Sequence, residues 1–139
     1  MNIAYISADF GVPIFGYKGA SIHVREMVAA LRKAGHAVSI VSPAIEELGD
    51  ARVREVLDES VALLPVPAAE RHLLLAQELE ALDEFLGMKT RVRQELRNLL
   101  YNLTLYEKVR EYLRAHPVDF IYERYTLFAA AGIRLAREL

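Results

Sequence analysis

A glycine-containing loop leads directly into a helical pattern and carries residue types that bind phosphate. The run Gly16-Tyr17-Lys18-Gly19-Ala20-Ser21 precedes an amphipathic stretch. Glycines let backbone N–H groups approach a ligand closely, and the dipole and unpaired N–H groups of a helix N-terminus favour an anion. Lys18 would add a positive charge and Ser21 a hydroxyl. The loop therefore predicts a phosphate site formed by Gly16, Lys18, Gly19, Ala20 and Ser21. The alternative is a loop that only connects two elements.

Two further groups of polar residues could act beside this loop. His23 falls in the first turn of the same helix, where a neutral imidazole could hydrogen-bond a ligand hydroxyl or accept a proton. It is the candidate catalytic residue, and the alternative is a histidine satisfied by the backbone. Glu123, Arg124 and Tyr125 follow an apolar run, and the two charged side chains suit sugar hydroxyls or phosphate. A local ion pair on a turn is the alternative there.

The spacing of the glycines excludes two nucleotide-cofactor loops. A dinucleotide fingerprint needs G-x-G-x-x-G next to the first strand and an acidic residue at the end of the second. Here two residues separate Gly16 from Gly19, and the second strand runs into Ser42-Pro43. A P-loop is also excluded, because Lys18 precedes Gly19 instead of following it. The chain has no cysteine, which excludes thiolate chemistry and cysteine metal sites. We expect no cofactor and no metal.

Length and charge bound the remaining function classes. A chain of 139 residues with 53% hydrophobic content suits one domain with a sizeable core. Its 17 basic and 19 acidic residues give a net charge of −2, which argues against a nucleic-acid partner. The apolar run at the N-terminus is broken at Asp9 and has no basic leader. We therefore expect neither a signal peptide nor a membrane anchor, and a cytoplasmic location.

The hydrophobic pattern predicts alternating strands and helices. Strands are expected at Asn2–Ser7, His36–Val41, Ser60–Pro65 and Asp119–Tyr122. Helices are expected from an N-cap at Ser21 to a C′ glycine at Gly35, and over 46–59, 69–87, 90–115 and Leu127–Leu139. This order predicts an α/β fold, a Rossmann-like doubly wound parallel sheet of about four strands in the order 3-2-1-4, with a long helical hairpin inserted. In that order the segments Gly11–Ser21 and Glu123–Tyr125 share one cleft edge.

The helical hairpin carries leucine stripes and a group of basic residues. The stripes, which we assign to the core, comprise Leu75, Leu79, Leu82 and Leu86 on the first helix and Leu96, Leu99 and Leu103 on the second. The basic residues are Lys89, Arg91, Arg93 and Arg97. They are interpreted as a solvated helix face, and the alternative is contact with anionic lipid or an anionic acceptor.

Two stretches of the chain resemble a known family. The run MNIAYISADFGVPIFGYKGASIHVREMVAALRKAGHAVSIVSP resembles the start of a retaining glycosyltransferase of the GT-B fold, family 4 type, in the glycogen synthase and sucrose synthase-like superfamily. The run DFIYERYTLFAAAGIRLAREL is similar to the fourth strand and following helix of the same domain, whereas residues 45–115 are only generally alike. The resemblance implies that Gly16, Gly19 and Ala20 reach the diphosphate of a nucleotide-sugar donor. It also implies that Glu123, Arg124 and Tyr125 line the acceptor cleft.

The resemblance carries expectations about organisation and partners. Residues 1–139 would be a single, truncated N-terminal, acceptor-side domain without the C-terminal donor-binding domain, and inactive alone. The complete enzyme would use a nucleotide-diphosphate sugar and a carbohydrate or lipid-linked acceptor, with peripheral contact at the inner face of the membrane as a further expectation. An open sheet edge beside the fourth strand is expected to invite association. The alternative is a non-catalytic α/β binding or scaffold module that acts through the helices of 69–115.

Overall fold

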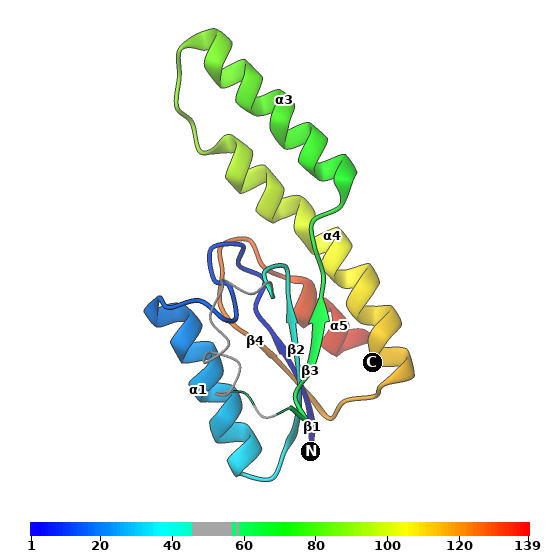
Figure 1. Cartoon of the computed structure of the whole chain (residues 1–139). Helices are drawn as coiled ribbons and strands as arrows, with labels where there is room; N and C mark the ends of the chain where they lie inside the picture. The colour runs from blue at the N-terminus through cyan, green and yellow to red at the C-terminus, as the bar shows by residue number, and fades with distance from the viewer. Residues whose placement is uncertain (46–56, 58) are drawn as a thin grey trace.

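A four-stranded parallel sheet forms the centre of the computed structural model, which describes residues 1–45, 57 and 59–139 (Figure 1). The strands are β1 (Asn2–Ile6), β2 (Ala37–Ser42), β3 (Ala62–Pro65) and β4 (Phe120–Glu123). They lie in the order β3-β2-β1-β4 and pair in parallel throughout, so the predicted α/β fold and strand order are confirmed. The helix predicted over 46–59 falls almost wholly outside the described residues.

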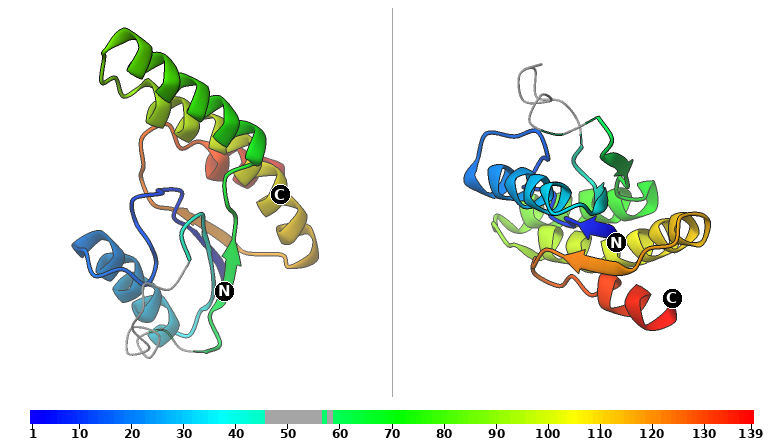
Figure 2. Two further views of the ribbon diagram at one scale, coloured as in Figure 1. Left: turned by 45° about the horizontal axis from the view of Figure 1, so that its top comes forward. Right: turned by 90° about the horizontal axis from the view of Figure 1, so that it is seen from below.

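Helices cover both faces of this sheet. Helix α1 (Gly19–Lys33) lies on one face, and α4 (Val92–Ala115) and α5 (Ala131–Glu138) lie on the other (Figure 2). Alternate residues of β1 enter the two cores: Tyr5 packs on the α1 side and Ile6 on the α4 side, and both are fully buried. Burial on both faces explains why the first strand is a continuous apolar run with no alternation of polar residues.

The start of α1 differs from the prediction, and its end agrees with it. The N-cap is Lys18 and not Ser21, because Gly19 and Ala20 already have helical backbone and no side chain caps the first turn. Ser21 lies inside the helix and is fully buried. At the other end Gly35 has φ +85°, and its N–H donates to the Arg32 carbonyl at 2.9 Å. A residue without Cβ is favoured in that left-handed conformation, so the predicted helix stop is confirmed.

The predicted hairpin forms, but its leucines do not make the core. Helix α3 (Glu70–Leu86) packs chiefly on α4 and extends past the sheet (Figure 1). Its buried residues are His72 and Ala76, while Leu75, Leu82 and Leu86 are 43%, 49% and 53% exposed. Their assignment to the core is therefore wrong. A short face centred on Ala76 suffices against a single neighbouring helix, and the leucine stripe is left towards solvent.

The buried face of α4 is also displaced from the leucine stripe. The residues that pack on the sheet share a helical spacing of four, namely Tyr101, Leu105, Val109 and Leu113. Leu99 and Leu103 are more than half exposed, so they too are outside the core. The hydroxyl of Tyr101 donates to the Val66 carbonyl at 2.5 Å and links α4 to the end of β3. Within the described residues, no helix has the length and hydropathy that crossing a membrane requires.

Helix α5 begins at Ala131, four residues later than predicted, because side chains from other elements define its start. Asn102 of α4 accepts hydrogen bonds from the N–H groups of Ala130 and Ala131 at 2.8 and 3.1 Å. Phe128, just before the helix, has φ +68°, a left-handed conformation that interrupts a continuous helix from Leu127. These contacts anchor the N-terminus of α5 to α4.

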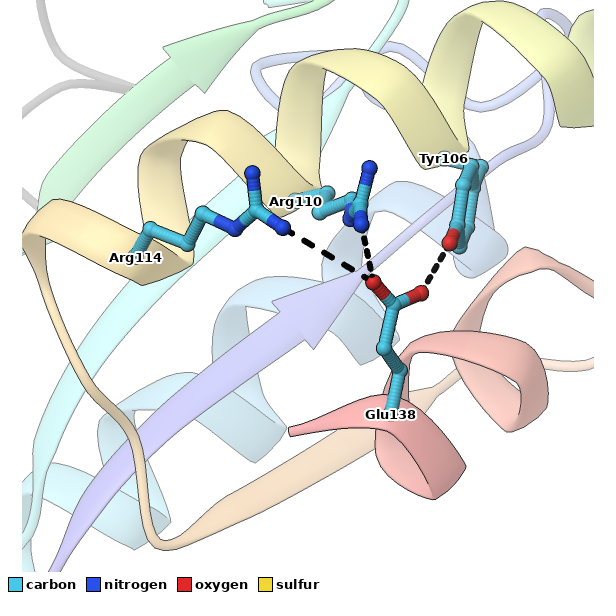
Figure 3. A network of polar contacts seen from close by, with 4 residues as sticks. All are labelled: Tyr106, Arg110, Arg114 and Glu138. Carbon is cyan, nitrogen blue, oxygen red and sulfur yellow. Dashed lines mark hydrogen bonds and ion pairs between the residues drawn. The ribbon is translucent and has the colours of Figure 1, made fainter.

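The C-terminal end of α5 is held on α4 by a polar network (Figure 3). Glu138 forms an ion pair with Arg110 at 2.5 Å, lies 4.0 Å from Arg114 and accepts a hydrogen bond from the Tyr106 hydroxyl. The hydrogen bond from Tyr106 is the largest cause that lowers the pKa of Glu138 below its ordinary value of 4.5, and the two arginines act in the same direction. The network joins both ends of α5 to the same helix.

Candidate functional site

The segments that follow β1 and β4 meet at the carboxyl edge of the sheet. Ile6 pairs with Glu123 in the β1–β4 register, and the Arg124 N–H donates to the Ile6 carbonyl at 2.9 Å. Beyond the strands, the Arg124 guanidinium lies 3.9 Å from the Asp9 carboxylate. Because ligands of doubly wound sheets bind outside the carboxyl ends where the strand order reverses, this edge is the candidate site.

Three residues predicted to line the cleft border one hollow at this edge. Glu123, Arg124 and Tyr125 line a space of about 360 Å³ together with Gly132 and Ile133 of α5. Tyr125 is 84% exposed. The Glu123 carboxylate, in contrast, accepts a hydrogen bond from the Gly132 N–H at 3.0 Å. A Cβ at Gly132 would lie 2.7 Å from that carboxylate, so glycine is what admits Glu123 to the start of α5. Glu123 therefore serves structure, while Tyr125 is open to a ligand.

The two glycines of the predicted phosphate loop have different surroundings. A Cβ at Gly16 would lie 2.7 Å from the Pro13 Cγ and 2.8 Å from the Ser21 Oγ. Packing alone therefore requires glycine at position 16. Among the described residues, a Cβ at Gly19 would meet nothing within 4 Å. Gly19 is thus the glycine that leaves open space at the N-terminus of α1.

Backbone donors gather at this N-terminus. The first hydrogen bond of α1 runs from the Ile22 N–H to the Lys18 carbonyl at 3.1 Å, so the N–H groups of Gly19, Ala20 and Ser21 precede it. Lys18 and Gly19 are exposed. The Ser21 hydroxyl is fully buried beneath Gly16 and has no hydrogen-bond partner among the described residues, and because the whole residue is fully buried, Ser21 offers no group to a ligand. We therefore correct the role predicted for its side chain.

His23, the candidate catalytic residue, is exposed on the first turn of α1. No hydrogen bond to its ring is found among the described residues. Its imidazole is therefore free to contact a ligand, and the alternative of a histidine satisfied by the backbone is not observed in the described part of the chain.

Arg25 supports the loop and was missed by the sequence analysis. It is only 6% exposed, and its Nη1 donates to the carbonyls of Ile14 and Gly16 at 2.6 and 2.8 Å. The loop between β1 and α1 is also tied to the end of β2, where the Ile14 N–H donates to the Ala44 carbonyl at 2.9 Å. The spacing along the helix could have indicated that Arg25 is buried. Arg25 follows Ser21 by four residues and precedes Val28 by three, which places it on the same, buried face of the helix.

A second arginine turns towards the β1 loop from α4. The Arg97 guanidinium lies over the Phe10 ring at 4.2 Å, and Phe10 packs edge-on against Tyr101 at 4.8 Å. Burial is the main cause that lowers the pKa of Arg97, the charge of Arg93 lowers it further, and Asp9 raises it. Arg97 and Arg124 thus both lie near the end of β1, where the carboxylates of Asp9 and Glu123 offset their charges.

The four basic residues of the hairpin consequently do not form one patch. Arg97 belongs to the carboxyl edge, and Arg93 pairs with Glu80 of α3 at 2.5 Å. Lys89 and Arg91 remain exposed at the turn between the helices. The prediction of a single solvated basic face is therefore wrong, because Lys89 and Arg91 precede α4 in the turn, whereas Arg93 and Arg97 have different partners on the helix.

Other features do not point to a site. Among the described residues, no group of three or more His, Asp or Glu could hold a metal ion. A second hollow of about 350 Å³ is lined by Asn2, Tyr112 and His116, among others. It lies at the amino ends of the strands, opposite the edge at which parallel α/β sheets bind ligands.

Comparison with known proteins identifies a family that matches most of the chain. Residues 18–139 match one family, described as a glycosyl transferase 4-like domain. No curated protein and no solved structure matches. The matched range contains α1 with Gly19 and His23, the hairpin, and β4 with the turn that follows it. Because the match covers well over half of the residues and agrees with the resemblance of both ends, the chain belongs to the family of glycosyl transferase 4-like domains.

Proposed function

We propose that this chain is the acceptor-side, N-terminal domain of a retaining glycosyltransferase of the GT-B fold. The complete enzyme transfers a sugar from a nucleotide-diphosphate sugar to a carbohydrate or lipid-linked acceptor. Family membership supports a glycosyltransferase module, and the carboxyl edge supplies the residues that donor and acceptor need. The nucleotide is held by a second domain, so these 139 residues do not catalyse transfer alone.

The observation that carries the proposal is the open N-terminus of α1 at Gly19. Transfer releases a diphosphate, and its developing negative charge is stabilised by donors fixed in advance. The N–H groups of Gly19 and Ala20 are such donors, and exposed Lys18 adds a charge beside them. Gly16 contributes indirectly, because its packing and the hydrogen bond from Arg25 hold the loop that leads to α1.

The acceptor is assigned to the hollow beside β4. Tyr125 offers an exposed ring for a sugar face, and Arg124 offers a guanidinium for hydroxyls or phosphate. Arg97 adds a further positive charge near the end of β1, where it lies over the Phe10 ring. His23 remains the candidate for proton transfer or for a hydrogen bond to a reacting hydroxyl, because it is exposed beside the donor loop.

Substitution of Gly19 in the full-length enzyme tests the donor site. Gly19→Val is expected to lower kcat/KM about 100-fold, because a β-branched side chain would keep phosphate away from the N–H groups. The fold should be retained, since a Cβ at this position meets nothing. Ala30→Val is the matched control, because Ala30 is exposed on the same helix. Activity would be assayed with a panel of nucleotide sugars, and unchanged turnover in Gly19→Val would refute the donor site.

Calorimetry on the chain alone tests the division between two domains. Nucleotide sugars should bind weakly or not detectably, because base and ribose have no pocket among the residues of the proposed site. Tight, stoichiometric binding to these 139 residues would contradict the assignment to the acceptor side.

The exposed leucines of α3 favour a second candidate, a non-catalytic binding or scaffold module that acts through the hairpin. Leu75, Leu82 and Leu86 offer the apolar face that a protein partner would cover. The two candidates differ in what accompanies the domain. A second Rossmann-like domain with paired glutamates, encoded with this one or beside it, supports the enzyme, whereas its absence from the genome would support the module.

A further inference from the structure

The turn that joins α3 to α4 is both apolar and basic. We call residues 85–94 the hairpin tip. Its large apolar side chains are all substantially exposed: Phe85 by 85%, Leu86 by 53%, Met88 by 52% and Val92 by 48%. The same stretch contains Lys89, Arg91 and Arg93 and neither aspartate nor glutamate. Exposed apolar groups interspersed with cations are typical of segments that enter the interface of an anionic membrane.

The turn is held in one conformation that keeps these side chains outside. Gly87 has φ +63°, and the Met88 N–H donates to the Asp83 carbonyl at 2.8 Å, which closes the end of α3. The Asp83 carboxylate accepts hydrogen bonds from the Thr90 N–H at 3.0 Å and from the Thr90 hydroxyl at 2.7 Å. Phe85 and Met88 are therefore presented by a braced turn and do not fold back onto the domain.

The distribution of charge restricts the part of the hairpin that suits an anionic surface to the tip. Arg93 is paired with Glu80, but neither Lys89 nor Arg91 has an ion-pair partner among the described residues. Along α3 the exposed leucines alternate with Glu78, Glu80 and Glu84. An anionic surface would repel those carboxylates, so the body of α3 is unsuited to lie on it and only the tip is complementary.

The position of the tip makes it accessible to a flat surface. The hairpin carries it past the carboxyl ends of the strands, to the point farthest from the sheet (Figure 1). A lipid interface needs no shaped pocket, since a few apolar side chains and cations acting together suffice.

We propose that the hairpin tip docks this domain on a lipid membrane with anionic headgroups. Phe85, Leu86 and Met88 enter the interface, while Lys89 and Arg91 contact the headgroups. This inference goes beyond the proposed function and needs no sugar donor. Where both hold, the carboxyl edge with its acceptor hollow lies on the side of the domain that carries the tip, and a lipid-linked acceptor would be reached from there.

Vesicle co-sedimentation of the chain tests the inference. The chain is expected to bind vesicles of phosphatidylcholine with phosphatidylglycerol, to bind phosphatidylcholine alone much less, and to be released by added salt. Lys89→Gln with Arg91→Gln should weaken binding about 30-fold, at about fivefold for each cation near an anionic surface. Phe85→Ser with Met88→Ser should weaken it at least tenfold, because two apolar side chains would no longer enter the interface.

Matched controls separate the tip from the rest of the hairpin. Leu74→Ser removes an apolar side chain that is 55% exposed on α3, and Lys108→Gln removes an exposed cation on α4. Both should bind like the parent chain. Circular dichroism would verify that every variant is folded.

Three results would overturn the inference. They are no binding to anionic vesicles by the folded parent chain, binding that the tip substitutions leave unchanged, and a loss as large in the controls as in the tip variants. If gel filtration showed that the tip substitutions abolish a dimer while vesicles are ignored, the tip would be a contact between copies of the chain. Because the assay contains no nucleotide sugar, its failure leaves the proposed glycosyl transfer to be judged by the Gly19→Val test.

Discussion

Arg25→Met should release the loop that leads from β1 into α1. The Arg25 Nη1 holds two backbone carbonyls, those of Ile14 and Gly16, at 2.6 and 2.8 Å. Methionine keeps most of the alkyl packing of arginine and removes only the donors and the charge. Both carbonyls would then need water or another donor in a region where Ile14 and Gly16 are themselves buried.

The size of the effect follows from these contacts. A hydrogen bond to a charged group contributes about 1.5 to 3 kcal/mol, so the loss of two costs about 4 kcal/mol. The Arg25 Nε is buried without a partner among the described residues, and its removal returns about 1 to 2 kcal/mol. The free energy of unfolding should therefore fall by about 2 to 3 kcal/mol. For a chain of this length, Tm should fall by about 6 to 10 °C.

Urea unfolding followed by far-ultraviolet circular dichroism measures this change directly, and the chain contains no tryptophan to report instead. Lys33→Met is the matched control, because it removes an exposed cation from the same helix and should change stability by less than about 0.5 kcal/mol. If Arg25→Met were no less stable than Lys33→Met, the two hydrogen bonds would not hold the loop, and the support inferred for Gly16 would fall with them.

Two further predictions concern buried and paired hydroxyl and carboxyl groups. Tyr5→Phe should leave the free energy of unfolding unchanged or raise it by up to about 1 kcal/mol, because the Tyr5 hydroxyl is buried without a partner among the described residues. Tyr101→Phe should lower it by about 1 kcal/mol through loss of the hydrogen bond to Val66. Urea titrations in which both variants changed the free energy of unfolding with the same sign would contradict this prediction. Burial raises the pKa of Tyr5 to about 12 from 10.0, so the neutral form favours the folded state, and Tyr5→Phe should remove a loss of stability between about pH 10 and 12. The pKa of Glu138 is lowered chiefly by the hydrogen bond from Tyr106, so its contribution is present above pH 4.5 and lost as the pH falls further. Glu138→Gln should flatten the acid side of the stability profile, and an unchanged profile would show that the network of Figure 3 does not stabilise α5.

The sheet was predictable because its strands carry a strong local signal. A strand buried on both faces is a continuous apolar run, and NIAYIS at the start of the chain has that form. Gly35 and Gly87 were equally informative, since both end helices with positive φ, at +85° and +63°. Such signals depend only on neighbouring residues, which is why the element order agrees with the prediction, whereas the strand order was predicted from the usual topology of doubly wound sheets.

The faces of the helices were not predictable in the same way. Leucines at helical spacing show that a helix has an apolar stripe, but they do not show which element covers it. On α3 the covered residues are His72 and Ala76, and Leu82 faces solvent. The start of α5 was not predictable for the same reason, because Asn102 and Glu123 fix it by hydrogen bonds from elements distant in the sequence. Tertiary contacts of this kind leave no local pattern.

The loop shows the same limit within the candidate site. The sequence does not distinguish Gly16 from Gly19. Only the packing of Pro13 and Ser21 around Gly16 shows that this glycine is required by its neighbours, whereas Gly19 has space around it. Ser21 had the correct type for an N-cap, yet the helix begins earlier and buries it. Residue type therefore predicts a candidate site only as a whole loop, and burial is needed to distinguish the residues that could reach a ligand from those that pack.

Net charge is the least informative of the sequence measures, because it sums groups that the fold separates. The value of −2 argues against a basic surface overall. The fold nevertheless places Arg97 over Phe10 and Arg124 beside Asp9 at the carboxyl edge, and it leaves Lys89 and Arg91 at the hairpin tip without an ion-pair partner among the described residues. Opposing carboxylates lie along α3, at Glu78, Glu80 and Glu84. A net charge of −2 therefore does not exclude the local group of cations on which the proposed membrane contact depends.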